Sequence, residues 1–281
     1  MNVKMFEWDQ EQDSELTIQS VVGLSLEEAE NDAREQKMGL ARAEELAKLA
    51  KQGVAFLREL AMAMTSHKDG DAPQIFTLDA LDETSRTMVT EVLGRGEVSG
   101  HITEPLALGI QESVFPGLWR VKNGADANAP EQLIIADVPP MLRASDIASQ
   151  DADMVIREDA QDVMNAMPVL AEVRDRVQAY ELGQDNHVIN FTLLPMSEAD
   201  MALLRDTLGV GHVDLMSKGY GACRVCSTRW AHVWSVQFFN SMDTIILDTL
   251  EVGDVPVSVR AAGADFEDSG ERILEIIEAY L

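Results

Sequence analysis

The sequence repeats itself at an offset of 115 residues, and this repeat limits the fold more than any other feature of the chain. Three motifs recur in the same order at this offset: 75–78 with 190–193, 93–98 with 208–213, and 118–121 with 233–236. A single offset kept across three motifs indicates a tandem duplication. A period this long makes each copy a domain rather than one unit of a solenoid.

The two copies differ in length near their ends. After residue 121 the offset becomes 117, where residues 133–139 match residues 250–256 and both stretches end in Asp-Val-Pro. The second copy is therefore predicted to be two residues longer in the connection before its last strand.

Each copy has the pattern of an α+β domain. A short strand (74–78 or 188–193) is followed by a helix that begins at Asp82 or Ser197, whose side chains can accept hydrogen bonds from free helix amides. Gly94 and Gly209 follow the helices, where a left-handed C-cap is expected. Three further strands are predicted near 107–112, 118–122 and 133–138, and near 222–228, 232–239 and 245–252.

The connections after each helix are short, which favours hairpins between neighbouring strands. The predicted fold class is α+β, with two tandem homologous domains. Each is a mainly antiparallel sheet with helices packed on one side, and an N-terminal helical extension precedes them.

The predicted domains are an acidic N-terminal extension and helix (1–46), a first repeat domain (47–157) and a second repeat domain (158–281). The helical stretch from about residue 25 to 66 is expected to break near Gly39 or Gly53. Residues 144–153 are polar and small, as in a linker, and a helix from about 268 to 280 closes the chain.

The charge of the chain excludes several classes of partner. There are 22 Lys and Arg against 49 Asp and Glu, which gives a formal net charge of −27. Such a polyanion cannot release phosphate counterions, so we expect no nucleic acid and no anionic membrane surface as partner. No stretch is apolar enough for membrane insertion, and the first residues lack the apolar core of a secretory signal. We therefore expect a cytoplasmic protein.

The chain carries no pattern typical of catalysis. Neither a nucleophile elbow nor a phosphate-binding loop occurs, so we expect no enzyme and no catalytic residue. Cys223 and Cys226 are the two cysteines, and one C-x-x-C is half a zinc site. In a strand, residues three apart point to opposite faces, so we expect no metal or other cofactor on this pair.

The second copy keeps more specific polar and aromatic residues than the first, which makes it the better candidate for a working surface. Trp119 and Trp234 lie at equivalent positions and are interpreted as structural. The predicted partner-binding residues all lie in the second copy: Tyr220, Gly221, Cys223, Arg224, Arg229, Trp230, Asn240, Met242 and Asp243.

Two strings of the second copy resemble one protein family. Gly-Tyr-Gly-Ala-Cys-Arg-Val-Cys-Ser-Thr-Arg at 219–229, and Val-Trp-Ser-Val-Gln-Phe-Phe-Asn-Ser-Met-Asp-Thr from residue 233, are similar to the hydrogenase expression/formation protein HupH (HyaF) family. Shorter likenesses in the first copy extend the resemblance over about residues 70–281. The resemblance implies an accessory, chaperone-like factor for maturation of a membrane-bound [NiFe] uptake hydrogenase. Its implied partners are a precursor subunit, such as the iron–sulfur small subunit before export, and other hydrogenase accessory proteins.

Two alternatives remain open at this point. The protein could handle iron–sulfur clusters or a metal through Cys223, with further ligands from a partner. It could also be an enzyme of a kind that these motifs do not identify.

Overall fold

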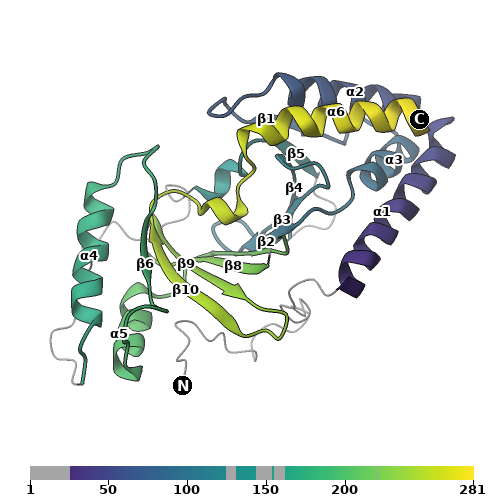
Figure 1. Cartoon of the computed structure of the whole chain (residues 1–281). Coiled ribbons are helices and arrows are strands. Elements are labelled where there is room, and N and C mark those ends of the chain that lie inside the picture. The colour runs from purple at the N-terminus through teal and green to yellow at the C-terminus, as the bar shows by residue number, and fades with distance from the viewer. Residues whose placement is uncertain (1–25, 125–130, 144–153, 155–161, 220) are drawn as a thin grey trace. The chain divides into compact units, whose positions relative to one another are not determined.

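A computed structural model of the chain describes residues 26–124, 131–143, 154, 162–219 and 221–281 (Figure 1). The first 25 residues of the predicted N-terminal extension and the linker predicted at 144–153 lie outside these residues. The described chain forms two compact units. Residues 26–142 and 259–281 form the first-repeat unit, and residues 143–258 form the second-repeat unit.

The first-repeat unit contains a five-stranded antiparallel sheet in the order β1-β5-β4-β3-β2. The strands are β1 (Gln74–Thr77), β2 (Val98–Ile102), β3 (Leu108–Glu112), β4 (Leu118–Asn123) and β5 (Gln132–Ile135). The helices are α1 (Leu26–Ala47), α2 (Lys51–Ser66), α3 (Glu83–Leu93) and α6 (Gly263–Tyr280), and a short 3-10 turn, η1, spans Pro140–Leu142.

One face of this sheet and the helices share a single core. Leu118 pairs with Ile135 and Phe76 pairs with Leu133, so their side chains lie on the same face. They pack with buried residues of α2, α3 and α6. Figure 1 shows α6 lying along α2.

The second-repeat unit repeats this sheet with fewer helices. Its strand order is β7-β8-β9-β10-β6, again antiparallel throughout. Its elements are α4 (Ala166–Ala179), β6 (His187–Asn190), α5 (Glu198–Leu208), β7 (Val213–Ser217), β8 (Ala222–Ser227), β9 (Val233–Phe239), β10 (Ile245–Val252) and the 3-10 turn η3 (Val257–Val259), whose last residue belongs to the first-repeat unit. Ile189, Val233, Leu250 and Val252 share one face and pack with α4 and α5. The predicted α+β class with two similar domains is therefore confirmed, as is a helix before the first repeat.

Strand pairing confirms the predicted offset of 115 residues between equivalent positions over most of the repeat. Ser99 pairs with Gln111 as Asp214 pairs with Cys226, which keeps the offset of 115. Helices α3 and α5 begin with the expected caps, since the side chains of Asp82 and Ser197 accept hydrogen bonds from the backbone N–H three residues on. Gly94 and Gly209 have positive φ as predicted, but their ψ angles are extended, so the chain leaves each helix at once.

Both ends of the repeat depart from a constant offset. Leu118 faces Ile135 and Val233 faces Val252, which confirms two additional residues within the β9–β10 hairpin. The turn itself is only residues 240–244, and β10 has a register shift between Ile245 and Leu247. In the first strand the ladder aligns Phe76 with Ile189, at an offset of 113, although the sequence identity aligns Phe76 with Phe191. The connection from β6 to α5 is therefore two residues longer than that from β1 to α3.

The predicted helix break is present a few residues before Gly53, but neither glycine forms it. The chain breaks between α1 and α2, at residues 48–50, and both glycines lie inside helices. A Cβ on Gly39 would lie 3.0 Å from the carbonyl oxygen of Glu91, and one on Gly53 would lie 2.6 Å from Cε of Met88. These glycines allow α1 and α2 to approach α3 closely, so they serve packing rather than chain reversal.

The C-terminal helix begins earlier than predicted, at Gly263, because the Asp265 carboxylate accepts the Ala262 N–H at 2.6 Å and closes the helix start. This helix packs in the first-repeat unit, although it follows the second repeat in the chain. The predicted boundary between residues 157 and 158 lies outside the described residues and stays a prediction.

Trp119 and Trp234 hold equivalent positions of the two units. Both are buried, and their indole N–H groups donate to the carbonyl oxygens of Ala136 and Gly253. Each carbonyl belongs to the residue just before an Asp-Val-Pro motif. The interpretation of both tryptophans as structural agrees with these contacts.

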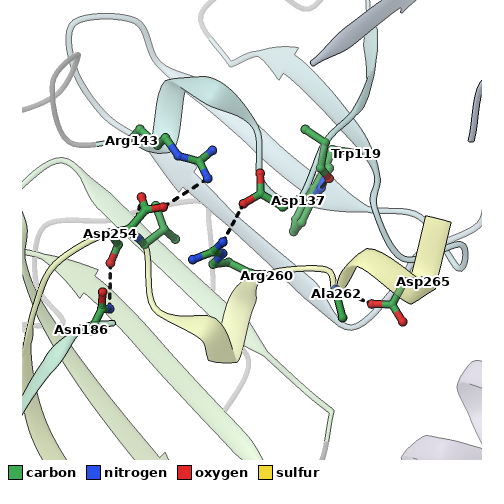
Figure 2. Close-up of polar contacts among 10 residues, drawn as sticks. Trp119, Asp137, Arg143, Asn186, Asp254, Arg260, Ala262 and Asp265 are labelled. Atoms are coloured by element: carbon green, nitrogen blue, oxygen red, sulfur yellow. Dashed lines mark hydrogen bonds and ion pairs between the residues drawn. The ribbon is translucent and has the colours of Figure 1, made fainter. Parts of the chain in front are cut away.

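In both repeats an arginine follows the Asp-Val-Pro motif after three intervening residues; these arginines are Arg143 and Arg260. In the first-repeat unit Arg260 pairs with Asp137, with Nη2 and Oδ2 3.1 Å apart. In the second-repeat unit Arg143 pairs with Asp254 at 3.2 Å (Figure 2). Each aspartate thus pairs with the arginine that follows the Asp-Val-Pro motif of the other repeat. The segments that end in Arg143 and Arg260 are therefore exchanged between the repeats, and we call them the exchanged tails.

Candidate functional site

The β9–β10 hairpin of the second repeat ends in a tightly bonded turn. The side-chain Oδ1 of Asn240 accepts hydrogen bonds from the N–H groups of Met242 and Thr244, at 2.9 and 3.0 Å. Backbone bonds between Asn240 and Thr244 and from the Asp243 N–H to the Asn240 carbonyl close the turn, and Asp243 has φ of 55°. This network holds the Met242 side chain outward with 78% of its surface exposed.

Gly221 lies beside this turn. Ala222 pairs with Phe239 in the ladder, so the β7–β8 and β9–β10 turns are adjacent at one end of the sheet, here called the hairpin end. Gly221 is exposed with φ of 94°. Tyr220, the neighbouring predicted residue, lies outside the described residues.

Arg224 is not available as a partner-binding group in this structure. Its guanidinium forms a two-pronged ion pair with Asp214 of β7, at 3.0 and 2.6 Å, and both side chains are largely buried. Such a pair fixes strand register, because a lone buried charge would be costly. Arg224 therefore contributes to the frame of the site rather than to its surface.

The two cysteines point to different groups, as their spacing in the strand predicts. Cys226 donates to Asp214 at 3.5 Å, whereas the Cys223 thiol contacts the Ser258 side chain. Both are free and buried. Burial raises the pKa of Cys223 to about 11 and raises the pKa of Cys226 still further. Neutral, buried thiols are poor metal ligands, since the thiolate is the ligand form. No group of three His, Cys, Asp or Glu suited to a metal occurs among the residues described.

Arg229 and Trp230 lie at the opposite end of the sheet from the hairpin turns. The Trp230 indole donates to the carbonyl of Thr207 near the end of α5, and the Arg229 guanidinium lies over Gly209. Strand β8, about 20 Å long at 3.3 Å per residue, separates them from Gly221. The structure thus brings together Gly221, Asn240, Met242 and Asp243, and not the whole predicted set.

Three exposed apolar residues at the hairpin end were not predicted from the sequence. Leu193 is 79% exposed, Leu194 38% and Ile246 57%. Hydrogen bonds join their segments, because Asp248 accepts from the Phe191 N–H and donates its own N–H to Thr192 Oγ1. The apparent match of 190–193 with 75–78 concealed Leu193, because it implied a strand where the chain turns.

Within the described residues, no helix is long and apolar enough to cross a membrane. The fold and these contacts define a tandem-repeat α+β protein whose second copy presents a rigid, partly apolar hairpin end. Exposed apolar residues of this kind make the hairpin end a candidate site for protein binding.

Comparison with known proteins identifies the family. The model of the "HupH hydrogenase expression protein, C-terminal conserved region" matches the chain twice, over residues 51–161 and 163–280. The chain belongs to this family, and the two matches agree with the internal repeat.

Three relatives illustrate the likeness. The hydrogenase expression/formation protein HupH of Rhizobium leguminosarum bv. viciae is 41% identical over 85% of this chain and 86% of its own length. HupH of Rhodobacter capsulatus is 42% identical over 73% of both chains. The hydrogenase-1 operon protein HyaF of Escherichia coli K12 is 29% identical over 81% of both.

Proposed function

We propose that this protein is an accessory, chaperone-like factor in maturation of a membrane-bound [NiFe] uptake hydrogenase. It acts in the cytoplasm and binds a precursor subunit, the iron–sulfur small subunit, before export. It does so by protein–protein contact rather than by catalysis. The names of the relatives support the hydrogenase role, and the geometry of the hairpin end supports binding.

One observation carries the binding role: the Asn240 turn holds Met242 in the open on a rigid support. An exposed methionine is a flexible, polarisable contact, and fixing its backbone lowers the entropy lost on binding. The net charge of −27 attracts basic segments of a partner and raises the rate of encounter.

The first experiment is an anaerobic pull-down from cells that produce the hydrogenase. The small-subunit precursor is supplied with and without its leader. We expect capture of the leader-bearing form, weakened by salt because the surface is acidic. Capture of neither form would refute the proposal.

Two pairs of variants make this test specific for the turn. Asn240→Ala removes the acceptor for two backbone N–H groups and should weaken capture, whereas Asn240→Asp keeps the acceptor and should preserve it. Met242→Ser should weaken capture, and Met62→Ser is its control, since Met62 is 69% exposed on α2 of the first repeat. Equal capture by all four variants would remove the turn from the binding site.

Metal or cluster handling through Cys223 receives no support from the geometry, because the thiol is buried and held neutral. Iron analysis of anaerobically purified protein and maturation with a Cys223→Ser variant test it directly. Bound iron that is lost in the variant would revive this role.

A further inference from the structure

The second repeat has two additional residues at each of two places, and both places lie at the hairpin end. One is the β6–α5 connection, residues 191–197, and the other is the β9–β10 hairpin, measured between equivalent paired residues. They are far apart in the sequence but adjacent in space, since Phe191 and Thr192 bond to Asp248.

Both insertions place apolar side chains in solvent. The first carries Leu193 and Leu194, and the second adjoins Met242 and the bulged residue Ile246. In the first repeat, the connection from β1 to α3 begins with a buried leucine instead, because Leu78 is 1% exposed and packs in the core. The exposed apolar group is therefore an addition of the second repeat and not a feature of the shared fold.

We propose that Leu193, Leu194, Met242 and Ile246 form one docking patch for an apolar segment of a partner, flanked in that partner by basic residues. This inference rests on the proposed function and names the chemistry of the segment that the hairpin end receives. Apolar side chains held in water gain free energy when a partner covers them, which gives the patch its affinity.

The acidic charge around the patch favours a partner segment that carries basic residues. Exposed carboxylates of Asp243 and Glu198 border the patch, with Lys218 on the neighbouring turn. Two other occupants would be acidic. A second copy of this chain has a net charge of −27, and the first 24 residues of the chain have five acidic residues against one basic residue, Lys4. Both are repelled, whereas a segment with Lys or Arg beside its apolar run is attracted.

The variant for the test is Leu193→Ser, Met242→Ser and Ile246→Thr combined. Its matched control is Leu182→Ser with Val257→Ser, since these residues are 77% and 76% exposed in the same repeat, but Leu182 follows α4 and Val257 is the first residue of η3. The probe is the small-subunit precursor. We expect the patch variant to lose capture about tenfold or more and the control to keep it.

A photo-crosslinker in place of Leu193 identifies the occupant in the full-length protein. We expect a crosslink to an apolar run of the precursor with an adjoining Lys or Arg. A crosslink to a second copy, or to residues 1–25 of the same chain, would overturn the proposal. Absence of a crosslink while the precursor is captured would overturn it as well.

The two failures are distinguishable. If the wild-type protein captures no precursor, the proposed function fails. If the wild type and the patch variant capture it equally, the function stands and the patch is refuted. Unchanged circular dichroism and melting temperature of the patch variant establish that any lost capture is not caused by unfolding.

Discussion

The two repeats share one sheet but differ in what covers it. The ladder aligns α2 and α4 at an offset of 113, with their C-caps at His67 and Tyr180. In the first repeat, α6 packs on α2 so closely that a Cβ on Gly270 would lie 2.8 Å from the Ala61 carbonyl. The second repeat has Arg174 where the first has Ala61, so no helix can approach as closely there.

An aromatic contact shows the same difference. In the first repeat the Phe266 ring of α6 makes an edge contact with the His67 ring, with centroids 4.6 Å apart, and lies against Gly117, which has φ of 85°. In the second repeat His232 occupies the place of Gly117 with φ of 63°, and its own ring makes a tilted contact with the Tyr180 ring, with centroids 4.7 Å apart. A side chain thus fills the space that a helix fills in the other copy. The duplication preserved the hydrogen-bonded frame, while a few positions decide the outer layer.

The largest expected effect comes from giving the first repeat the arginine of the second. Ala61→Arg places a charge in the buried contact between α2 and α6 and should cost about 4 kcal/mol or more of unfolding free energy. The reverse change, Arg174→Ala, should alter stability by less than about 0.5 kcal/mol, because Arg174 is half exposed. Urea unfolding measures both, and equal effects would contradict the difference in packing between α2 and α4.

Next is the carboxylate of Asp200. It is buried and accepts the N–H groups of Met164, Asn165 and Ala166 on one oxygen, and the N–H and hydroxyl of Ser197 on the other. Burial raises its pKa, but these bonds outweigh burial and hold it at about 2. Asp200→Ala should cost about 3 kcal/mol, against about 1 kcal/mol for the equivalent Ser85→Ala.

The depressed pKa of Asp200 also fixes a pH dependence. This stabilisation is present above the ordinary pKa of 3.8 and is lost as pH falls toward about 2. Thermal melts of the wild type and Asp200→Ala should therefore converge on acidification. A constant gap between the two curves down to pH 2 would be inconsistent with this role.

The third effect concerns Glu112 of the first repeat, whose pKa is shifted in the opposite direction to that of Asp200. Burial raises the pKa of Glu112 to about 7, and the nearby carboxylates of Glu97 and Asp265 act in the same direction. Because the folded state holds the proton more tightly than the unfolded chain, stability falls as pH rises from about 4.5 to about 7, by at most about 3 kcal/mol.

Glu112→Gln should remove this loss, since an amide oxygen can still accept the Gly117 N–H. The variant should be more stable than the wild type above pH 7 and equal to it near pH 4. Ser227→Ala is the control, because Ser227 is the uncharged counterpart in the second repeat. Its difference from the wild type should not vary with pH.

The smallest effect tests the exchanged tails. Arg143→Gln and Arg260→Gln each break one partly buried ion pair and should each cost about 1 kcal/mol. Similar values would agree with the equivalence of the two pairs. A large effect of one substitution alone would show that the exchange is not symmetrical in energy.

Local signals in the sequence predicted much of the fold. The caps at Asp82 and Ser197, the helix ends and the register from α3 to β4 follow from neighbouring residues and from the repeat, and the structure has them. The sequence identity of Phe191 with Phe76 gave a wrong alignment of the first strands. In the hydrogen-bonded ladder the residue equivalent to Phe76 is Ile189. Phe191 lies beyond the end of β6 and bonds to Asp248 from a turn.

The candidate site was predicted in part. The predicted strands 232–239 and 245–252 left Asn240, Met242 and Asp243 in the connection between them, and the structure has an exposed hairpin turn there. Arg224 was expected at the surface, but Asp214 on the paired strand neutralises and buries it. That pairing depends on strand register, which no local pattern of residues encodes.

The sequence by itself determined the duplication, the α+β class, the acidic charge and the helix caps, because each depends on composition or on residues a few positions apart. Only the tertiary structure decided that α6 covers the first repeat, that Arg143 pairs with Asp254 and Arg260 with Asp137, and that residues 191–192 bond to Asp248 of β10. These contacts join residues more than fifty positions apart. They arise from packing and strand pairing, which select among many partners that are equally compatible with the local sequence.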